Sequence, residues 1–325
     1  MSSSQRNLVG YLFLGGGALV ILSQITQMAL PVERRSQVII PMVFGLLFFL
    51  LGAVASKEER TFAWLVRVLN KPSQWLEIQP WQVVALMLSL FYVVLAHYAA
   101  GDEGKAVSLF VAWTAWLIGI ASCFASGWKS NDLSLRSMWK PFAFALGLTV
   151  LALSFRAIAT NQIPIFLNGD EASAGIEAIR LMNGTINNPF IVGWYSFPSL
   201  YFLIPAASIS LLGHTTEALR IPSAIAGALT VGGTYLAGRA MFDKRTGLIA
   251  ALLLIGFHFH IHFSRIGLNN IWDGLFFVTA VGAALYAWEQ ENRNAYILVG
   301  LGLGLSQYFY PSSRILVVIV FGGII

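Results

Sequence analysis

The chain has 325 residues, of which 57% are hydrophobic and only 11% are charged, and its mean hydropathy is +0.71. Soluble domains carry about 25% charged residues, so this composition excludes an ordinary water-soluble globular protein. The net charge of +5 is small and the basic residues stand between apolar runs, a pattern of membrane topology signals that does not predict a nucleic-acid partner. We therefore expect an integral, multi-pass membrane protein surrounded by membrane lipids.

Apolar runs recur along the whole chain, and a helix needs about 20 apolar residues to cross a bilayer. They predict an all-α transmembrane bundle of about ten spans. The segment Lys57–Lys71 predicts an amphipathic helix on the membrane surface. The predicted spans are 8–30, 37–55, 81–99, 106–126, 140–158, 219–240, 247–263, 271–288, 295–310 and the start of another from 314.

Lysine- and arginine-rich loops define the orientation, because such loops stay in the cytoplasm. Placing the basic loops there, including Lys129–Lys140 and Arg239–Arg245, puts residues 159–218 on the outer side. Within this outer loop, 198–213 is apolar but short for a span, and we expect a re-entrant or interfacial helix. The sequence ends inside an apolar run, Phe321–Ile325, and we expect a longer protein to continue past it.

The chain divides by content into two parts. Residues 1–130 form a predicted four-span module without chemistry-bearing motifs, and 140–325 form a predicted catalytic membrane core. The first candidate catalytic residues of the core are Asp170 and Glu171, which follow Asn168 at the start of a predicted helix. This pattern fits a capping box, in which Asn168 and Glu171 satisfy the first backbone amides. It also fits a general base held at the membrane surface.

Further polar groups stand at predicted outer helix ends. Arg265 follows three alternating histidines, of which His262 is one, and Asp273 begins the next span. Arg265 fits either a phosphate ligand or an interfacial anchor, and its pairing with Asp273 would lower the cost of an intramembrane acid. The histidines would share one face only in an extended segment. A divalent metal is therefore possible but unsupported, and we expect no required cofactor.

An aromatic segment completes the outer set. Tyr310 and Arg314 lie in the run Tyr308–Arg314, which fits either a substrate contact or an ordinary aromatic belt with an anchoring arginine. The chain contains no Walker loop, no serine nucleophile elbow and no Asp-x-Asp motif.

Five motifs follow one another in a fixed order. They are Gly169–Glu171, a predicted aromatic and proline helix at Trp194–Tyr201, Ala218–Ser223, Ala237–Asp243, and His260–Arg265 with Asp273. This ordered set resembles the GT-C glycosyltransferases of glycosyltransferase family 39 type, which include protein O-mannosyltransferases and lipid A aminoarabinose transferases. The resemblance covers about 140–325, and the first four spans look like an addition to it. Where many relatives have His-Pro-Pro, this chain has Phe197-Pro198-Ser199.

This resemblance implies an inverting transferase that takes a sugar from a polyprenyl-phosphate carrier on the extracytoplasmic side of a bacterial plasma membrane. The acceptor would be a lipid, a protein or a glycan. Asp170 would be the catalytic base, Glu171 would position donor or acceptor, and Arg265 would bind the phosphate. Tyr195, His262, Asp273, Tyr310 and Arg314 complete the predicted substrate-binding residues.

A transporter or flippase of a lipid-linked or small substrate is the alternative, since it too would place polar residues within a bundle. Such proteins usually show inverted repeats or paired broken helices, and no internal repeat is evident in the sequence.

Overall fold

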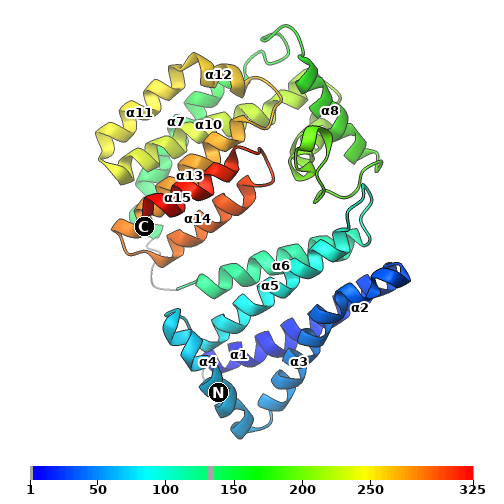
Figure 1. Cartoon of the computed structure of the whole chain (residues 1–325). Coiled ribbons are helices and arrows are strands. Elements are labelled where there is room, and N and C mark those ends of the chain that lie inside the picture. Colours follow the sequence, from blue (N-terminus) through cyan, green and yellow to red (C-terminus); the bar gives the residue numbers. More distant parts are fainter. Residues whose placement is uncertain (1–2, 130–134, 325) are drawn as a thin grey trace. The chain divides into compact units, whose positions relative to one another are not determined.

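The computed structural model describes residues 3–129 and 135–324, and within them every regular element is a helix (Figure 1). An isolated bridge between Val192 and Pro198 is the one strand-like pairing in this part of the chain. The predicted all-α class is therefore confirmed. The chain divides into two compact units, Met1–Trp128 and Lys129–Ile325.

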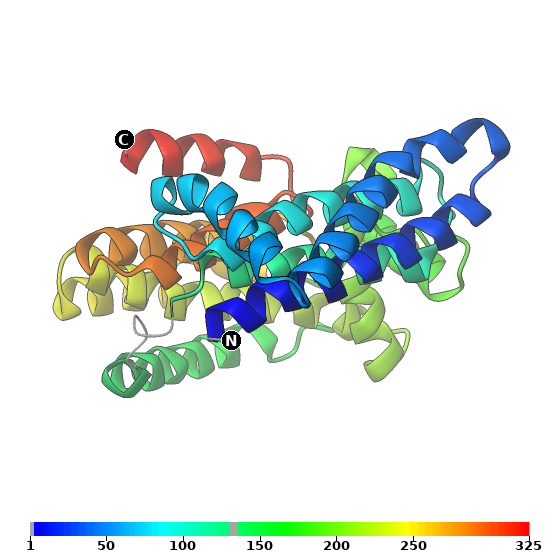
Figure 2. The same cartoon turned by 90° about the horizontal axis from the view of Figure 1, so that it is seen from below.

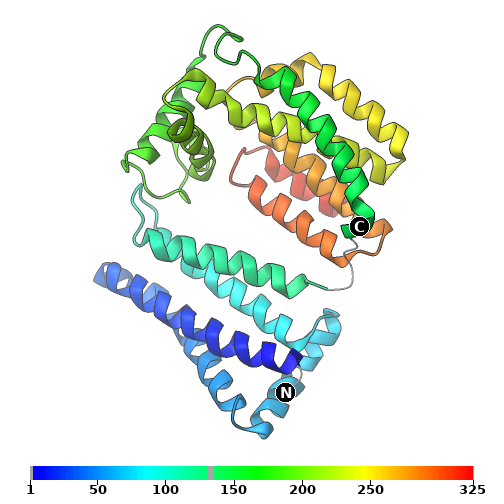
Figure 3. The same cartoon turned by 180° about the vertical axis from the view of Figure 1, so that it is seen from behind.

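Unit 1 is built from helical hairpins whose backbones approach closely. A Cβ atom added at Gly16 would lie 2.5 Å from the Phe49 nitrogen, so only glycine permits this contact between α2 and α3. Figure 3 shows α1, η1 and α2 as one continuous rod. Its elements are α1 (Ser3–Gly10), η1 (Tyr11–Gly15), α2 (Gly16–Ala29), η2 (Val32–Val38), α3 (Ile39–Ala55), α4 (Glu59–Trp75), α5 (Pro80–Ala100) and α6 (Leu109–Gly127).

Unit 2 is organised around its longest helix, α10, which packs against α7, α9, α11, α12 and α13. In Figure 2, α7 (green) and α15 (red) lie on opposite sides of the helices between them. The elements are α7 (Leu135–Ala157), α8 (Gly169–Met182), η3 (Trp194–Ser196), η4 (Ser199–Phe202), α9 (Leu203–Leu212), α10 (Thr216–Met241), α11 (Lys244–Gly256), α12 (His258–Ser264), α13 (Ile271–Glu289), α14 (Arg293–Ser306) and α15 (Ser313–Ile324).

Six helical stretches are long and apolar enough to cross a membrane, or seven if α11 and α12, bent by 64° at Phe257, form one broken span. These helices support an integral multi-pass membrane protein, although the predicted total of about ten spans is not reached. The remaining predicted spans are also helices, but they are too charged or too short to be counted. The helix α10 contains Glu217, Arg220 and Arg239, while α14 and α15 have 14 and 12 residues. The six are Ser3–Ala29, Val32–Ala55, Pro80–Ala100, Leu109–Gly127, Trp139–Ala157 and Ile271–Glu289.

Three local predictions can be compared with the structure. The amphipathic stretch is the helix α4, and Ser199–Leu212 is an apolar helix too short to be counted as a span. The aromatic segment predicted as one helix is instead two short 3-10 turns, η3 and η4, because Phe197 and Pro198 between them are extended. Much of the basic loop Lys129–Lys140 lies outside the described residues.

Candidate functional site

The first turn of α8 carries the acidic pair. Asn168 caps the helix as predicted, since its Oδ1 accepts a hydrogen bond from the Glu171 nitrogen at 2.7 Å. The other half of the predicted capping box does not form. The Glu171 carboxylate leaves its own helix end and binds a partner from α10 instead.

That partner is Arg220, and the two side chains form a fully buried ion pair. Arg220 donates through Nε and Nη2 to the two carboxylate oxygens of Glu171 at 2.6 and 2.9 Å, and both side chains are 0% exposed. The Gly267 nitrogen donates to the same carboxylate at 2.7 Å. Bidentate pairs of this kind combine strength with fixed geometry. Glu171 therefore ties α8 to α10 and to the segment after α12.

Arg220 uses its other donors on the segment between α7 and α8. Its Nη1 donates to the carbonyl oxygens of Thr160 and Pro164, each at 2.7 Å, and its Nη2 donates to Phe166 at 3.2 Å. All five N–H groups of a guanidinium are thereby engaged. Arg220 lies within the Ala218–Ser223 motif, and the sequence predicted no role for it. An arginine inside a long apolar helix is the signal that could have marked it.

Arg265 likewise binds backbone carbonyl oxygens, those at the end of α7 and in the segment directly after it. It donates from Nε, Nη1 and Nη2 to five carbonyl oxygens between residues 155 and 163, at 2.7 to 3.2 Å. Burial, followed by repulsion from Arg220, lowers the pKa of Arg265 from its usual range. No N–H group is left for a phosphate in this arrangement. The expected pairing with Asp273 is wrong, because backbone carbonyls take every donor.

Asp170 differs sharply from its neighbour Glu171. Its side chain is exposed, and it has no hydrogen-bond partner within the described residues. Its backbone is nevertheless held in place, since Asn168 caps the helix on one side and the buried Glu171–Arg220 pair anchors the other. The arrangement presents an accessible carboxylate on a rigid helix end. Such a group can accept a proton from a bound hydroxyl.

Asp273 has its own partners at the start of α13. Its two carboxylate oxygens accept hydrogen bonds from the hydroxyls of Ser312 and Ser313, the latter at 2.5 Å. Next to these serines, Arg314 is exposed, and no hydrogen bond or ion pair within the described chain engages its side chain. Tyr310 stacks on Phe197 with ring centroids 5.6 Å apart. The Tyr195 side chain lies outside the described part of the structure.

The histidines lie on a helix, α12, so alternation does not bring them to one face. His258 and His262 are both exposed, while His260 accepts a hydrogen bond at Nδ1 from Arg156 Nη2 at 3.0 Å. Because arginine only donates, the proton of a neutral His260 sits on Nε2. Across the described residues, no three His, Cys, Asp or Glu side chains gather in a cluster that could hold a metal ion.

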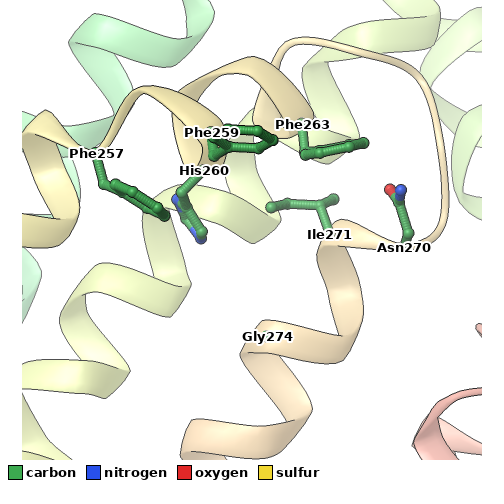
Figure 4. A pocket seen from close by; sticks show the side chains of 7 residues that line it. All are labelled: Phe257, Phe259, His260, Phe263, Asn270, Ile271 and Gly274. Carbon is green, nitrogen blue, oxygen red and sulfur yellow. The ribbon is translucent and has the colours of Figure 1, made fainter.

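Two cavities adjoin at His260 and Gly274. The first has a volume of about 310 Å³ and lies between α12 and the start of α13, with Phe257, Phe259 and Phe263 beside it (Figure 4). The second, of about 430 Å³, is lined by Asp273, Ser312 and Ser313 together with apolar side chains of α13 and α15. Several residues that the motifs singled out, His260 and Asp273 among them, therefore line these two adjoining cavities.

The two stretches that carried the catalytic hypothesis do converge. Gly267, which binds Glu171, stands two residues after Arg265 and six before Asp273. Consecutive Cα atoms are about 3.8 Å apart, so the backbones of Gly267 and Asp273 lie within roughly 23 Å of each other. Glu171 thus joins the start of α8 to the segment beside Arg265, whereas neither Asp170 nor Arg265 is among the residues that line the two cavities.

A model of a known protein family matches part of the chain. Residues 196–324 match the model of the family described as dolichyl-phosphate-mannose-protein mannosyltransferase. This segment is shorter than the predicted extent of 140–325. It includes Arg220, Arg265 and Asp273, whereas Asp170 and Glu171 precede it. No curated protein and no solved structure matches the chain. The C-terminal part of the chain is thus similar to a mannosyltransferase family, and this similarity supports a membrane glycosyltransferase that uses a lipid-linked sugar donor.

Proposed function

We propose that this protein is an inverting glycosyltransferase that moves a sugar from a polyprenyl-phosphate donor to a hydroxyl acceptor on the extracytoplasmic side of the membrane. The acceptor is a protein, a lipid or a glycan. The observation that carries the proposal is the exposed Asp170 on a helix end that the buried Glu171–Arg220 pair holds beside the family-matched segment.

In this reaction Asp170 acts as the general base. The acceptor oxygen attacks the anomeric carbon of the sugar, its proton passes to the Asp170 carboxylate, and the bond from the anomeric carbon to the phosphate oxygen breaks. The lipid phosphate leaves with the bonding electron pair. A single displacement inverts the anomeric configuration. A base must reach the proton it removes, and of the acidic pair only Asp170 is exposed.

Glu171 contributes to this reaction by holding other residues in place. It is fully buried and bound to Arg220 and to the Gly267 nitrogen, so its carboxylate is occupied by protein groups. It holds the helix start that presents Asp170. We assign it a positioning role in place of direct contact with donor or acceptor.

A departing lipid phosphate needs a cation, and Arg314 is the better candidate of the two predicted arginines. Arg314 is exposed, while Arg265 has all its donors on backbone carbonyls. An arginine binds phosphate through paired N–H groups. We propose that Arg314 contacts the phosphate and that Arg265 shapes the wall of the site.

The test is sugar transfer from radiolabelled polyprenyl-phosphate sugars in membranes containing the protein. Asp170→Asn keeps the size of the side chain and removes the base, so we expect transfer to fall about 100- to 10,000-fold. Glu177→Gln on the same helix is the control, because Glu177 pairs with Arg180 on α8 itself. Transfer that survives Asp170→Asn at the wild-type rate would remove Asp170 as the base. Absence of transfer by the wild-type protein with every such donor would overturn the proposed activity.

A further inference from the structure

The two adjoining cavities of unit 2 form a groove, here called the α12–α13 groove, that runs past His260 and Gly274. Its walls are mostly apolar, with phenylalanines of α12 at one end and Phe277, Ile315 and Leu316 at the other. Pockets with apolar walls and a few converging polar groups are the usual sites of small ligands. The polar groups of such a site define which ligand it takes.

The polar groups that line this groove in the described chain include a single carboxylate, that of Asp273. Among the described residues that line it, Asp273 is the one acidic side chain, and no lysine or arginine accompanies it. His260 takes a hydrogen bond from Arg156 at Nδ1 and so lines the groove as a neutral ring. The Asp273 carboxylate accepts hydrogen bonds from the hydroxyls of Ser312 and Ser313. A phosphate inside the groove would meet this carboxylate, and no described lysine or arginine lines the same walls.

The Asp273 carboxylate retains capacity for a ligand. An ionised carboxylate offers about four acceptor positions on its two oxygens, and the two serine hydroxyls occupy two of them. The remaining positions suit hydroxyl donors. An acid within a transmembrane helix is costly unless it serves such a purpose.

We propose that the α12–α13 groove binds the neutral glycosyl ring of the donor, with Asp273 accepting hydrogen bonds from its hydroxyls and the apolar walls contacting its carbon faces and the adjoining chain. This inference rests on the proposed function and makes it more specific. It separates a sugar subsite, at Asp273, from the phosphate contact assigned to Arg314. Asp273 is thereby a specificity-determining residue for uncharged, hydroxyl-bearing sugars.

Binding can be measured without any transfer. The full chain in lipid nanodiscs is titrated with tritiated octyl mannoside, with empty nanodiscs as the background, and octyl phosphate is added as competitor. We expect saturable binding of the mannoside that octyl phosphate does not displace. Asp273→Asn should weaken mannoside binding roughly two- to tenfold, the value of one ordinary hydrogen bond, without weakening any binding of octyl phosphate.

Gly274 allows the groove itself to be blocked. A Cβ atom at Gly274 would make only an ordinary contact, 3.4 Å from Thr230 Cγ2, so Gly274→Ala fits the fold, whereas Gly274→Leu fills the space where the cavities meet. We expect at least a tenfold loss of mannoside binding for the leucine variant and a smaller loss for the alanine variant. Gly300→Leu is the control, since Gly300 is exposed on α14 and a Cβ there meets nothing within 4 Å.

Opposite results would overturn the proposal. Mannoside binding that is unchanged in both Asp273→Asn and Gly274→Leu, or that octyl phosphate displaces as well as unlabelled mannoside does, removes the sugar subsite. These outcomes are separable from a failure of the proposed function. A protein that binds mannoside with the expected dependence but transfers nothing loses the activity alone, and one that transfers normally with unchanged binding in Asp273→Asn loses the subsite alone.

Discussion

Units 1 and 2 hold their helices together by different means. In unit 1 the helices meet at close backbone approaches at glycines and through neutral hydrogen bonds, such as the one from the Tyr92 hydroxyl to the Gly15 carbonyl at 2.7 Å. In unit 2 a buried ion pair and two fully engaged arginines organise the segment between α7 and α8. Close packing of small residues is the inexpensive way to join membrane helices. Buried charge is a costly alternative, so its use in unit 2 marks the region where a defined geometry matters.

The sharpest test of this contrast removes Glu171. Glu171→Ala leaves the Arg220 guanidinium buried without its counter-ion, and we expect a loss of about 3–5 kcal/mol in the free energy of unfolding. Thermal and denaturant unfolding in detergent would measure it. The control is Asp170→Ala in the same turn of α8, whose carboxylate is exposed, and which should cost about 1 kcal/mol or less. Equal losses in the two variants would show that the buried pair is not special.

A second test concerns the clamp made by Arg265. Arg265→Lys keeps the positive charge but offers three donors in place of five, so some of the carbonyls between residues 155 and 163 lose their partner. We expect stability to fall by about 1–3 kcal/mol, with little change in the KM for the lipid donor. Arg314→Gln should show the reverse, an unchanged unfolding midpoint and a raised KM. A raised KM for Arg265→Lys at unchanged stability would restore Arg265 as the phosphate ligand.

Arg220 and Arg265 also show what a single sequence can and cannot reveal. The cap at Asn168 and the start of α8 were predictable, because the four consecutive residues from Asn168 to Glu171 encode them. The Glu171–Arg220 pair joins positions 49 residues apart, and nothing local to either residue specifies the other. Arg265 was predicted as a phosphate ligand because its charge is visible in the sequence. Its actual partners are backbone carbonyls, which every residue possesses and no pattern distinguishes.

The aromatic segment gives the same lesson on a smaller scale. Its composition predicted one helix, but residues before a proline avoid the helical region, and Phe197 is extended ahead of Pro198. Helix existence was predictable for most of the spans because apolar runs are long and local. The number of membrane-spanning helices was less predictable. The helix α10 is long, but it includes the buried charge of Arg220, and composition alone does not tell whether such a helix crosses the membrane.

Unit 1 offers the converse experiment. Gly16→Ala would bring a Cβ to 2.5 Å from the Phe49 nitrogen and 2.7 Å from the Gly45 carbonyl oxygen, and we expect overpacking to cost about 1–3 kcal/mol. Gly10→Ala is the control, because nothing lies within 4 Å of a Cβ there. Unfolding in detergent measures both. If Gly16→Ala is as stable as Gly10→Ala, close backbone contact is not what joins α2 to α3.

The smallest effect is expected from an exposed charge, Asp243, which caps α11. Its Oδ1 accepts a hydrogen bond from the Thr246 nitrogen at 2.7 Å, and the Thr246 bonds lower the pKa of the carboxyl from its usual 3.8. A depressed folded-state pKa contributes stability that is present above the unfolded value of 3.8 and is lost as the pH falls through the folded value. Opening of the first turn of α11, followed by hydrogen exchange at the Thr246 amide after correction for the intrinsic rate, should therefore increase only in acid. Asp243→Asn retains a capping oxygen that does not titrate, so its opening should be independent of pH across this range. Because this cap lies in water, unlike Glu171, the change should stay within the first turn, and acid-induced opening that spreads to the whole of unit 2 would contradict the distinction between exposed and buried charge.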